Sequence, residues 1–278
     1  MIGKELRKKL YKDLPYETSY KRAYEDTELL KKPPLRSVRV QLELLKPDLY
    51  LLAQNINEAI VCFGSARVWP EKESKARLAK AKKELATNPR SKKLQEAVHA
   101  AEGLLSLSHY YEIGRELGKL IVTKSRNRFA VMTGGGPGLM EAANRGAYEN
   151  GGTSIGMNIT LPHEQEPNPY ISKDMAFLFH YFSIRKMHLV IRSKAVVVLP
   201  GGFGTFDEMF ELLTLIQTGK KERIPIILVG KEFWSKVVNV KALSDYGVIN
   251  PDDCRMYQVV DTAQEAWDII AKFYRLDK

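Results

Sequence analysis

Cysteine is scarce in this sequence: Cys62 and Cys254 are the only two among 278 residues. They lie far apart, and neither belongs to a CxxC pair or has histidines at metal-ligand spacing. This pattern does not support a disulfide framework or a zinc site. It is typical of proteins from a reducing compartment, and we expect a cytoplasmic protein.

Long apolar runs and metal-binding motifs are also missing. No run approaches the roughly 20 apolar residues that span a bilayer, and the opening stretch MIGKELRKKLYKDLPYE is too charged for a signal peptide. The five histidines form no HExxH motif and no helical ligand pair. We therefore expect no membrane segment and no bound metal ion.

The charge balance is basic, with 43 Lys and Arg against 33 Asp and Glu, a net charge of +10. Such a balance favours anionic partners, namely nucleotides, phosphates or nucleic acid, but does not choose among them. The 67–128 region is rich in Lys and Arg. Helical charges of this kind are usually a solvated face, so we do not expect nucleic acid as a partner.

The chain divides at about residue 57. Residues 1–57 are polar, compatible with helices and interrupted by the breaker KKPPLR, which indicates a helical N-terminal extension. Residues 58–278 form the predicted main domain, whose first strand lies in AIVCFGSARVWP. Two or three helices are expected over residues 71–124, with a turn at ATNPRS.

Strand and helix patterns alternate after residue 124. The strand-like runs are apolar without alternation, which is typical of a parallel sheet covered by helices on both faces, and we predict a doubly wound α/β domain. The expected strands lie at 128–135, 153–159, 174–182, 194–202, 224–230 and 256–261, and the expected helices at 136–151, 183–193, 205–220, 232–247 and 263–275.

Two glycine-rich loops stand at expected strand ends, GGGPGLM after one strand and PGGFGTFDE after another. Glycine allows positive φ and close backbone approach, so amide N–H groups at the following helix N-terminus can bind a phosphate. Tight turns alone would also explain the glycines. Neither loop is a Walker A or GxGxxG motif. The candidate substrate-binding residues here are Gly134, Gly135, Gly136, Gly138, Gly201, Gly202, Phe203, Gly204 and Thr205.

Two charged residues near helix starts are the candidate catalytic groups. Glu208 follows the second loop, where a carboxylate could complement the helix dipole or could face a ligand cavity. Arg185 lies near the start of another expected helix, where the dipole opposes a cation, so an anionic ligand would explain it. In a cavity, Glu208 could stabilise the developing cation of a glycosidic cleavage.

The motif PGGFGTFDE fits the PGGxGTxxE signature of the LOG ("Lonely guy") family, long labelled lysine decarboxylases, and GGGPGLMEAANRGA resembles that family's other glycine motif. The resemblance covers about residues 58–275. It implies a Rossmann-like fold, usually dimeric, and a phosphoribohydrolase that splits a nucleoside 5′-monophosphate, such as AMP or a cytokinin precursor, into base and ribose 5-phosphate. It implies no cofactor.

The resemblance also assigns residues. An Arg-Lys pair ahead of the PGG motif matches Arg185 and Lys186, and the terminal acid of the motif matches Glu208. A ligand-contacting threonine looks matched by Thr214, which could equally be an ordinary packed helix residue. A further acid is matched loosely by Glu164 or by the nearby Glu166.

Two rival functions stay open. One is a nucleotide- or DNA-binding protein of similar fold without turnover. The other, lysine decarboxylation, needs a lysine that forms a Schiff base, and neither Lys186 nor Lys194 has a context that singles it out. The preferred base cannot be derived from the sequence.

Overall fold

The structure is a computed structural model that describes residue 5 and residues 20–162 and 166–276. Contacts within the chain divide it into two units, Met1–Lys46 and Pro47–Lys278. The candidate site lies wholly in the second unit.

The described part of the first unit is helical, as its polar sequence predicted. A short helix α3 (Thr27–Lys31) is capped by Asp26, whose Oδ1 accepts a hydrogen bond from the Leu29 amide at 2.9 Å. The breaker KKPPLR forms the 3₁₀ turn η1 (Pro33–Leu35), after which helix α4 (Arg36–Ala53) begins. The boundary at residue 57 between extension and domain stays a prediction.

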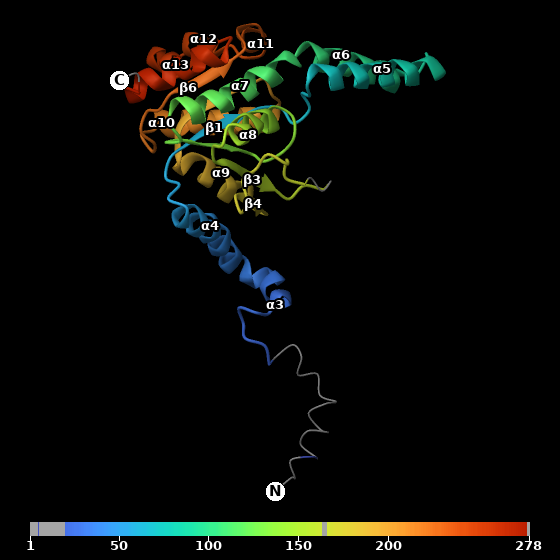
Figure 1. The fold of residues 1–278 in the computed structure, drawn as a ribbon. Coiled ribbons are helices and arrows are strands. Elements are labelled where there is room, and N and C mark those ends of the chain that lie inside the picture. Colours follow the sequence, from blue (N-terminus) through green and yellow to red (C-terminus); the bar gives the residue numbers. More distant parts are fainter. Residues whose placement is uncertain (1–4, 6–19, 163–165, 277–278) are drawn as a thin grey trace. The chain divides into compact units, whose positions relative to one another are not determined.

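The second unit is built on a seven-stranded sheet in the order β4-β3-β2-β1-β5-β6-β7. Every pair of neighbouring strands is parallel, which confirms the predicted doubly wound α/β class (Figure 1). The strands are β1 (Ala59–Phe63), β2 (Ala130–Thr133), β3 (Ser154–Ile159), β4 (Ala176–Phe179), β5 (Ser193–Val198), β6 (Ile226–Val229) and β7 (Gln258–Val260).

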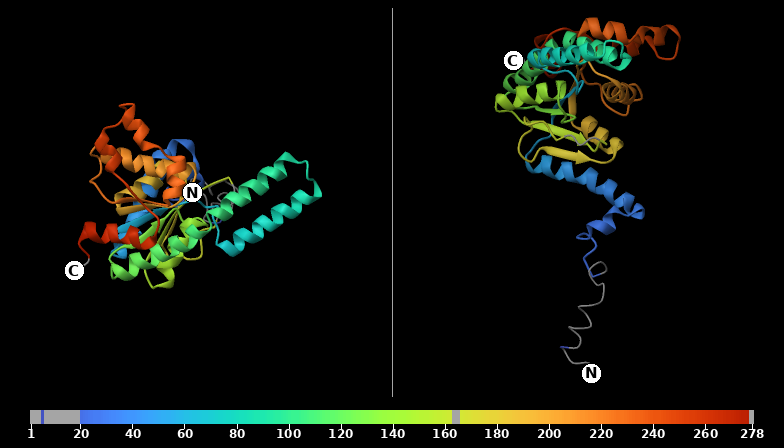
Figure 2. Two further views of the ribbon diagram at one scale, coloured as in Figure 1. Left: turned by 90° about the horizontal axis from the view of Figure 1, so that it is seen from above. Right: turned by 90° about the vertical axis from the view of Figure 1, so that its right-hand side faces the viewer.

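Helices cover both faces of this sheet, which is why central strands such as β1 are buried at every residue (Figure 2). Helices α7 (His109–Lys124), α8 (Leu139–Glu149) and α13 (Ala263–Tyr274) share one hydrophobic core with alternate residues of the central strands. Helices α9 (Phe182–Ile191) and α10 (Phe203–Gln217) lie on the other face, linked by ion pairs. Among the described residues, no helix is long and apolar enough to cross a membrane.

The strand order reverses direction at β1. From β1 the chain first builds outward through β2, β3 and β4, and then returns to place β5 on the other side of β1. In doubly wound sheets the loops separate at this switch point and leave a crevice beyond the carboxyl ends of the strands, where ligands bind. Both glycine loops open there, because they follow β2 and β5.

Two further predictions have different outcomes. The region 71–124 forms three helices, α5 (Glu71–Thr87), α6 (Lys92–Ser106) and α7, with the expected turn between the first two. The single helix predicted over 232–247 is wrong: it is two helices, α11 (Lys231–Val237) and α12 (Val240–Asp245). The chain is extended at Val238, and Asn239 starts the second helix because its side chain accepts a hydrogen bond from the Ala242 amide at 3.1 Å.

Candidate active site

Three loops meet at the carboxyl edge of the sheet: residues 64–66 after β1, the first glycine loop (134–138) and the second glycine loop (200–204). Ser65 joins all three. Its amide donates to the Pro200 carbonyl at 3.0 Å, and its carbonyl accepts from the Leu139 amide at 3.0 Å.

The candidate catalytic residues Arg185 and Glu208 are in direct contact at this edge. The Arg185 Nη2 atom lies 2.5 Å from Glu208 Oε1, and the two side chains are only 8% and 11% exposed. Arg185 Nη1 also donates to the carbonyl of Met157 in β3, at 3.4 Å. A Cβ placed on Gly134 would lie 3.2 Å from Nη1, so the first glycine loop borders the same ion pair.

Burial dominates the electrostatics of this pair. It raises the pKa of the Glu208 carboxyl above its usual range, and the positive charge of Arg185 offsets only part of that effect. The Arg185 Nε is buried and has no hydrogen-bond acceptor among the described residues. Buried ion pairs contribute little net stability, and perturbed carboxyls in a crevice are typical of functional sites.

Helix α10 has a bare N-terminus at the carboxyl edge of the sheet. Gly202 is its N-cap and supplies no side-chain hydrogen bond, and the Phe206 amide is bonded to the Gly202 carbonyl at 3.1 Å. The amides of Phe203, Gly204 and Thr205 therefore lie ahead of the first intrahelical bond, where helices bind anions.

Two glycines of the first loop are required by the backbone whatever the ligand. Gly135 and Gly138 have φ of 74° and 72°. A Cβ would lie 2.0 Å from Oδ1 of Asn158 at the first position and 2.5 Å from the Ser65 carbonyl oxygen at the second. Tight packing thus accounts for these two glycines, as the alternative explanation from the sequence held.

The amide of Gly135 is already engaged: it donates to Thr133 Oγ1 at 2.9 Å. The Gly135 carbonyl accepts from the Asn168 amide at 2.9 Å. In this conformation Gly135 has no donor left for a phosphate. Gly134, Gly136 and Gly138 are the remaining candidates in the first loop.

A buried polar network that the sequence reading missed holds the first loop in place. The Asn144 Oδ1 accepts from Thr133 Oγ1 at 2.6 Å and from Asn168 Nδ2 at 2.9 Å, and the Asn144 Nδ2 donates to Ser154 Oγ at 2.8 Å. Asn168 Nδ2 also lies 3.1 Å from the Gly136 carbonyl oxygen. The one available signal was an asparagine inside a helix, since asparagine is a poor helix former unless its amide has partners.

Lys186 contacts two acids on α10. Its Nζ lies 3.1 Å from both Asp207 Oδ1 and Glu211 Oε2. Burial alone would lower the pKa of Lys186, but the two carboxylates outweigh burial and raise it. The structure therefore places this lysine beside the candidate site as a link between α9 and α10.

The other predicted site residues are dispersed. Thr214 is exposed, and its Oγ1 donates back to the Phe210 carbonyl at 2.8 Å, as an ordinary helix residue does. Phe203 stands at the start of α10 with 96% of its surface exposed. Glu164 lies outside the described residues, and Glu166 is exposed.

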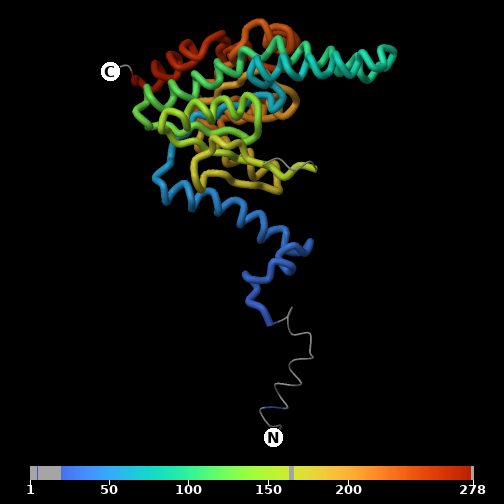
Figure 3. The backbone as a smooth tube through the Cα atoms, turned by 45° about the vertical axis from the view of Figure 1, so that its right-hand side comes forward, coloured from blue at the N-terminus to red at the C-terminus, as the bar shows by residue number. Residues whose placement is uncertain are grey.

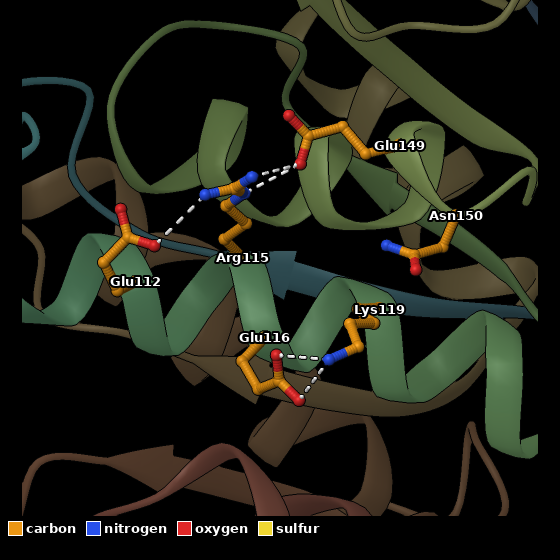
Figure 4. A pocket seen from close by; sticks show the side chains of 6 residues that line it. All are labelled: Glu112, Arg115, Glu116, Lys119, Glu149 and Asn150. Carbon is orange, nitrogen blue, oxygen red and sulfur yellow. Dashed lines mark hydrogen bonds and ion pairs between the residues drawn. The ribbon is translucent and has the colours of Figure 1, made fainter.

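A separate hollow of about 270 Å³ lies between α7 and the end of α8 (Figure 4). Helix α8 starts at the carboxyl end of β2 and runs back toward the start of β3, so its last residues lie at the opposite edge of the sheet from the glycine loops. The charges there neutralise one another, with Arg115 2.7 Å from Glu149 and Lys119 3.1 Å from Glu116. We therefore place the candidate active site at the carboxyl edge. The hollow is lined by Glu112, Arg115, Glu116, Lys119, Glu149 and Asn150.

Comparisons with known proteins find several that are similar to this chain. Residues 140–270 match the family model described as "Possible lysine decarboxylase". A probable cytokinin riboside 5′-monophosphate phosphoribohydrolase of Oryza sativa subsp. japonica is 25% identical over 167 residues, which cover 59% of this chain and 77% of the relative. The cytokinin riboside 5′-monophosphate phosphoribohydrolase of Mycobacterium tuberculosis is 28% identical over 159 residues, 56% of this chain and 82% of the relative.

A solved structure, described as the molybdenum cofactor binding protein from the phototrophic bacterium Rippkaea orientalis, is also similar. It is 21% identical, with a TM-score of 0.44 over 59% of this chain and 88% of its own. A likeness of this size adds nothing to the fold that the sheet itself shows. The matched family span includes both Arg185 and the PGGFGTFDE motif. Together with the similarity to the two phosphoribohydrolases, it confirms the predicted resemblance to the LOG family.

Proposed function

We propose that this protein is a nucleoside 5′-monophosphate phosphoribohydrolase, which hydrolyses the N-glycosidic bond of a purine or cytokinin-type nucleotide such as AMP. The products are the free base and ribose 5-phosphate. The observation that carries the proposal is the buried Arg185–Glu208 ion pair at the carboxyl edge, between the two glycine loops. The names of the relatives support the same activity. The cytoplasmic location expected from the sequence stays part of this proposal.

The chemistry fits a buried carboxylate. When the bond between C1′ and the base nitrogen breaks, its electrons leave with the base and positive charge develops on the ribose ring. The Glu208 carboxylate stabilises that charge and orients the attacking water, whose oxygen bonds to C1′. A proton from this water ends on the departing base. Arg185 favours the charged form of Glu208, and its unmatched Nε is assigned to the anionic substrate.

The 5′-phosphate is assigned to the backbone amides and to one hydroxyl. The first-turn amides of α10 and the Thr205 hydroxyl form one side of its site, and the amides of Gly134 and Gly136 form the other. Among the described residues nothing is hydrogen-bonded to the Thr205 side chain, which lies against Gly201: a Cβ on that glycine would be 2.2 Å from Thr205 Oγ1.

Lysine decarboxylation, which the matched family name suggests, fits the geometry poorly. A lysine that forms a Schiff base reacts as the neutral amine, which requires a lowered pKa. Lys186 has the opposite shift because Asp207 and Glu211 hold its ammonium group. Lys194 forms an ion pair with Glu58 at 3.5 Å, and no feature of its described surroundings marks it as a nucleophile.

Incubation with AMP tests the proposal. We expect adenine and ribose 5-phosphate to appear in equal amounts, with no release of inorganic phosphate, as measured by chromatography. Protein that binds AMP but releases no base from any nucleoside monophosphate would instead support the rival, a nucleotide-binding protein without turnover.

We also propose that the protein is a homodimer or a larger homo-oligomer, as the family resemblance implies. Helices α9 and α10 expose several large apolar side chains, which suit contact with a second copy. Sedimentation equilibrium is expected to give at least twice the mass of one chain, and the Met187→Glu/Ile191→Glu variant is expected to shift the mass toward that of one chain. A wild-type mass of one chain contradicts the proposal. The exposed side chains are Phe182, Met187, Ile191, Phe203 and Phe210.

A further inference from the structure

Helices α5 and α6 form a hairpin that projects beyond the sheet, and we call residues 71–106 the helical arm (Figures 2 and 3). A parallel connection from β1 to β2 needs only one crossover helix, which α7 supplies. Within the two arm helices only Ser74 and Val98 are buried. The arm therefore contributes little to the core of the sheet, and its surface is free for another use.

The arm carries an excess of positive charge that gathers at its tip. Its 36 positions hold nine Lys or Arg and five Glu. The tip is residues 80–99, which are the last two turns of α5, the connecting turn and the first two turns of α6, and it holds six basic residues and two acids, Glu84 and Glu96. Glu96 makes no ion pair among the described residues. The tip is thus more basic than the arm as a whole.

Nearby acids do not neutralise this charge. Glu71, Glu73 and Glu102 are each within 3.0 Å of a basic arm residue, and Glu84 lies 4.0 Å from Lys80. After these pairings, four cations of the tip have no ion pair among the described residues. They are Lys83, Arg90, Lys92 and Lys93.

Two of these cations occupy unfavourable positions for the fold. Lys92 and Lys93 lie in the first turn of α6, which contains no acid, and the positive end of the helix dipole repels cations there. Helix stability would favour Asp or Glu at these positions. The arm therefore keeps basic residues at some expense to its own stability, which a solvated helix face does not require.

The tip also lacks the features of an apolar interface. No large hydrophobic side chain is exposed in residues 71–106, so neither membrane insertion nor a hydrophobic protein contact has an anchor there. Contacts to a phosphate backbone need only Lys, Arg and polar groups, independent of base sequence. We propose that the arm tip, through Lys83, Arg90, Lys92 and Lys93, binds the phosphate backbone of nucleic acid.

This inference goes beyond the proposed hydrolase activity and does not depend on it. The sequence alone had favoured a solvated face for these charges and no nucleic acid partner. The structure favours a nucleic acid partner because these charges gather at a projecting tip. They have no ion pairs with acids there, and two of them lie where the helix dipole repels cations.

The experiment compares two variants with the same net charge. In the tip variant Lys83, Arg90, Lys92 and Lys93 are all changed to Gln. In the control variant four exposed lysines without ion pairs in the described body, at positions 124, 173, 220 and 272, are changed to Gln. Fluorescence anisotropy then follows the binding of labelled duplex DNA and of single-stranded RNA of equal length, at salt concentrations from about 50 to 200 mM.

Wild-type protein and the control variant are expected to bind with a steep salt dependence. Each phosphate contact contributes a slope of about −0.9 in log K against log salt for duplex DNA and about −0.7 for a single strand. The tip variant is expected to bind at least tenfold more weakly in low salt, with a slope shallower by up to about 3.6 on duplex DNA. The ratio of the DNA and RNA losses shows which nucleic acid the tip prefers.

Three results would overturn the proposal: no binding of either nucleic acid by the wild-type protein, equal binding by wild-type and tip variant, or equal losses in both variants. Circular dichroism of the tip variant checks that the arm remains helical. Base release from AMP is expected to be unchanged in the tip variant, so failure here and failure of the hydrolase proposal are measured separately.

Discussion

The Glu208→Gln variant is expected to release adenine from AMP at least about a hundredfold more slowly than the wild-type protein. Glutamine keeps the shape of the side chain but removes the negative charge that faces the developing positive charge on the ribose. Removing one pre-organised electrostatic group of this kind costs about 2.7–4 kcal/mol of transition-state stabilisation, which is a factor of 10² to 10³ in kcat. Single-turnover measurements of base release give the comparison directly.

A matched control distinguishes loss of the Glu208 charge from loss of any negative charge on α10. Asp207→Asn removes a carboxylate from the adjacent position, where it contacts Lys186 and is half exposed. We expect this variant to retain activity within a few-fold of the wild-type protein, because surface ion pairs contribute about 0–1 kcal/mol. Equal losses at positions 207 and 208 would mean that Glu208 has no special role.

Loss of folding is the main competing cause of inactivity at Glu208. The substitution leaves the Arg185 guanidinium buried without its counter-charge, which costs about 3–5 kcal/mol in comparable buried pairs. Replacing both partners, as in Arg185→Met/Glu208→Met, removes the uncompensated charge and is expected to recover much of the stability. If the double variant is folded and still inactive, the loss of activity comes from the missing catalytic groups and not from unfolding. Wild-type rates in folded Glu208→Gln would contradict the assignment.

The pH dependence of kcat gives an independent check on the same carboxyl. Because burial raises the pKa of Glu208, its carboxylate form is lost at a higher pH than for an ordinary glutamate. The rate constant kcat should therefore fall as the pH drops through that raised pKa and reach its plateau above it. The residual activity of Glu208→Gln should lack this acid limb. A limb that persists in the variant would come from another group, such as the substrate phosphate.

The sheet could be predicted from the sequence because each parallel strand is buried on both faces. Runs such as Ala195–Leu199 are short, contain no polar residue and are rich in valine, which is typical of a strand between two helical layers. The glycine loops could be placed for a related reason, since parallel strands all end at one edge. The break between α11 and α12 could not, because it depends on one local cap by Asn239 in a segment with ordinary helical composition.

The candidate site was only half visible in the sequence. The charged pair could be predicted because an arginine near a helix start departs from the usual pattern, and because Glu208 matches the terminal acid of the PGGxGTxxE signature. The hydrogen bond between Asn144 and Asn168 was not predicted, because the two residues are 24 positions apart and neither local sequence indicates the other as a partner. The same holds for Ser65, whose backbone joins the two glycine loops. Hydrogen bonds between backbone atoms can be made by almost any residue type, so the sequence does not predict them.

Adenosine in place of AMP is expected to lower kcat/KM for base release by about a thousandfold or more. The bare N-terminus of α10 and the amides of Gly134 and Gly136 have no role in this scheme except to bind the 5′-phosphate. A thousandfold change corresponds to about 4 kcal/mol, which is comparable to the loss of one or two such contacts in the transition state. Equal rates on AMP and adenosine would contradict the use assigned to both glycine loops.

A pair of isosteric variants tests whether that phosphate lies at the start of α10. Thr205→Val removes the hydroxyl assigned to the phosphate and keeps the volume of the side chain, so it should weaken reaction with AMP about tenfold and leave adenosine unchanged. Thr214→Val makes the same change two turns later, at an exposed residue bonded to its own helix. We expect no selective loss there. A different result would be that Thr214→Val alone reduces the preference for AMP. The ligand contact that the family resemblance implies at Thr214 would then be correct. The phosphate would lie farther along α10 than the free amides at the start of that helix.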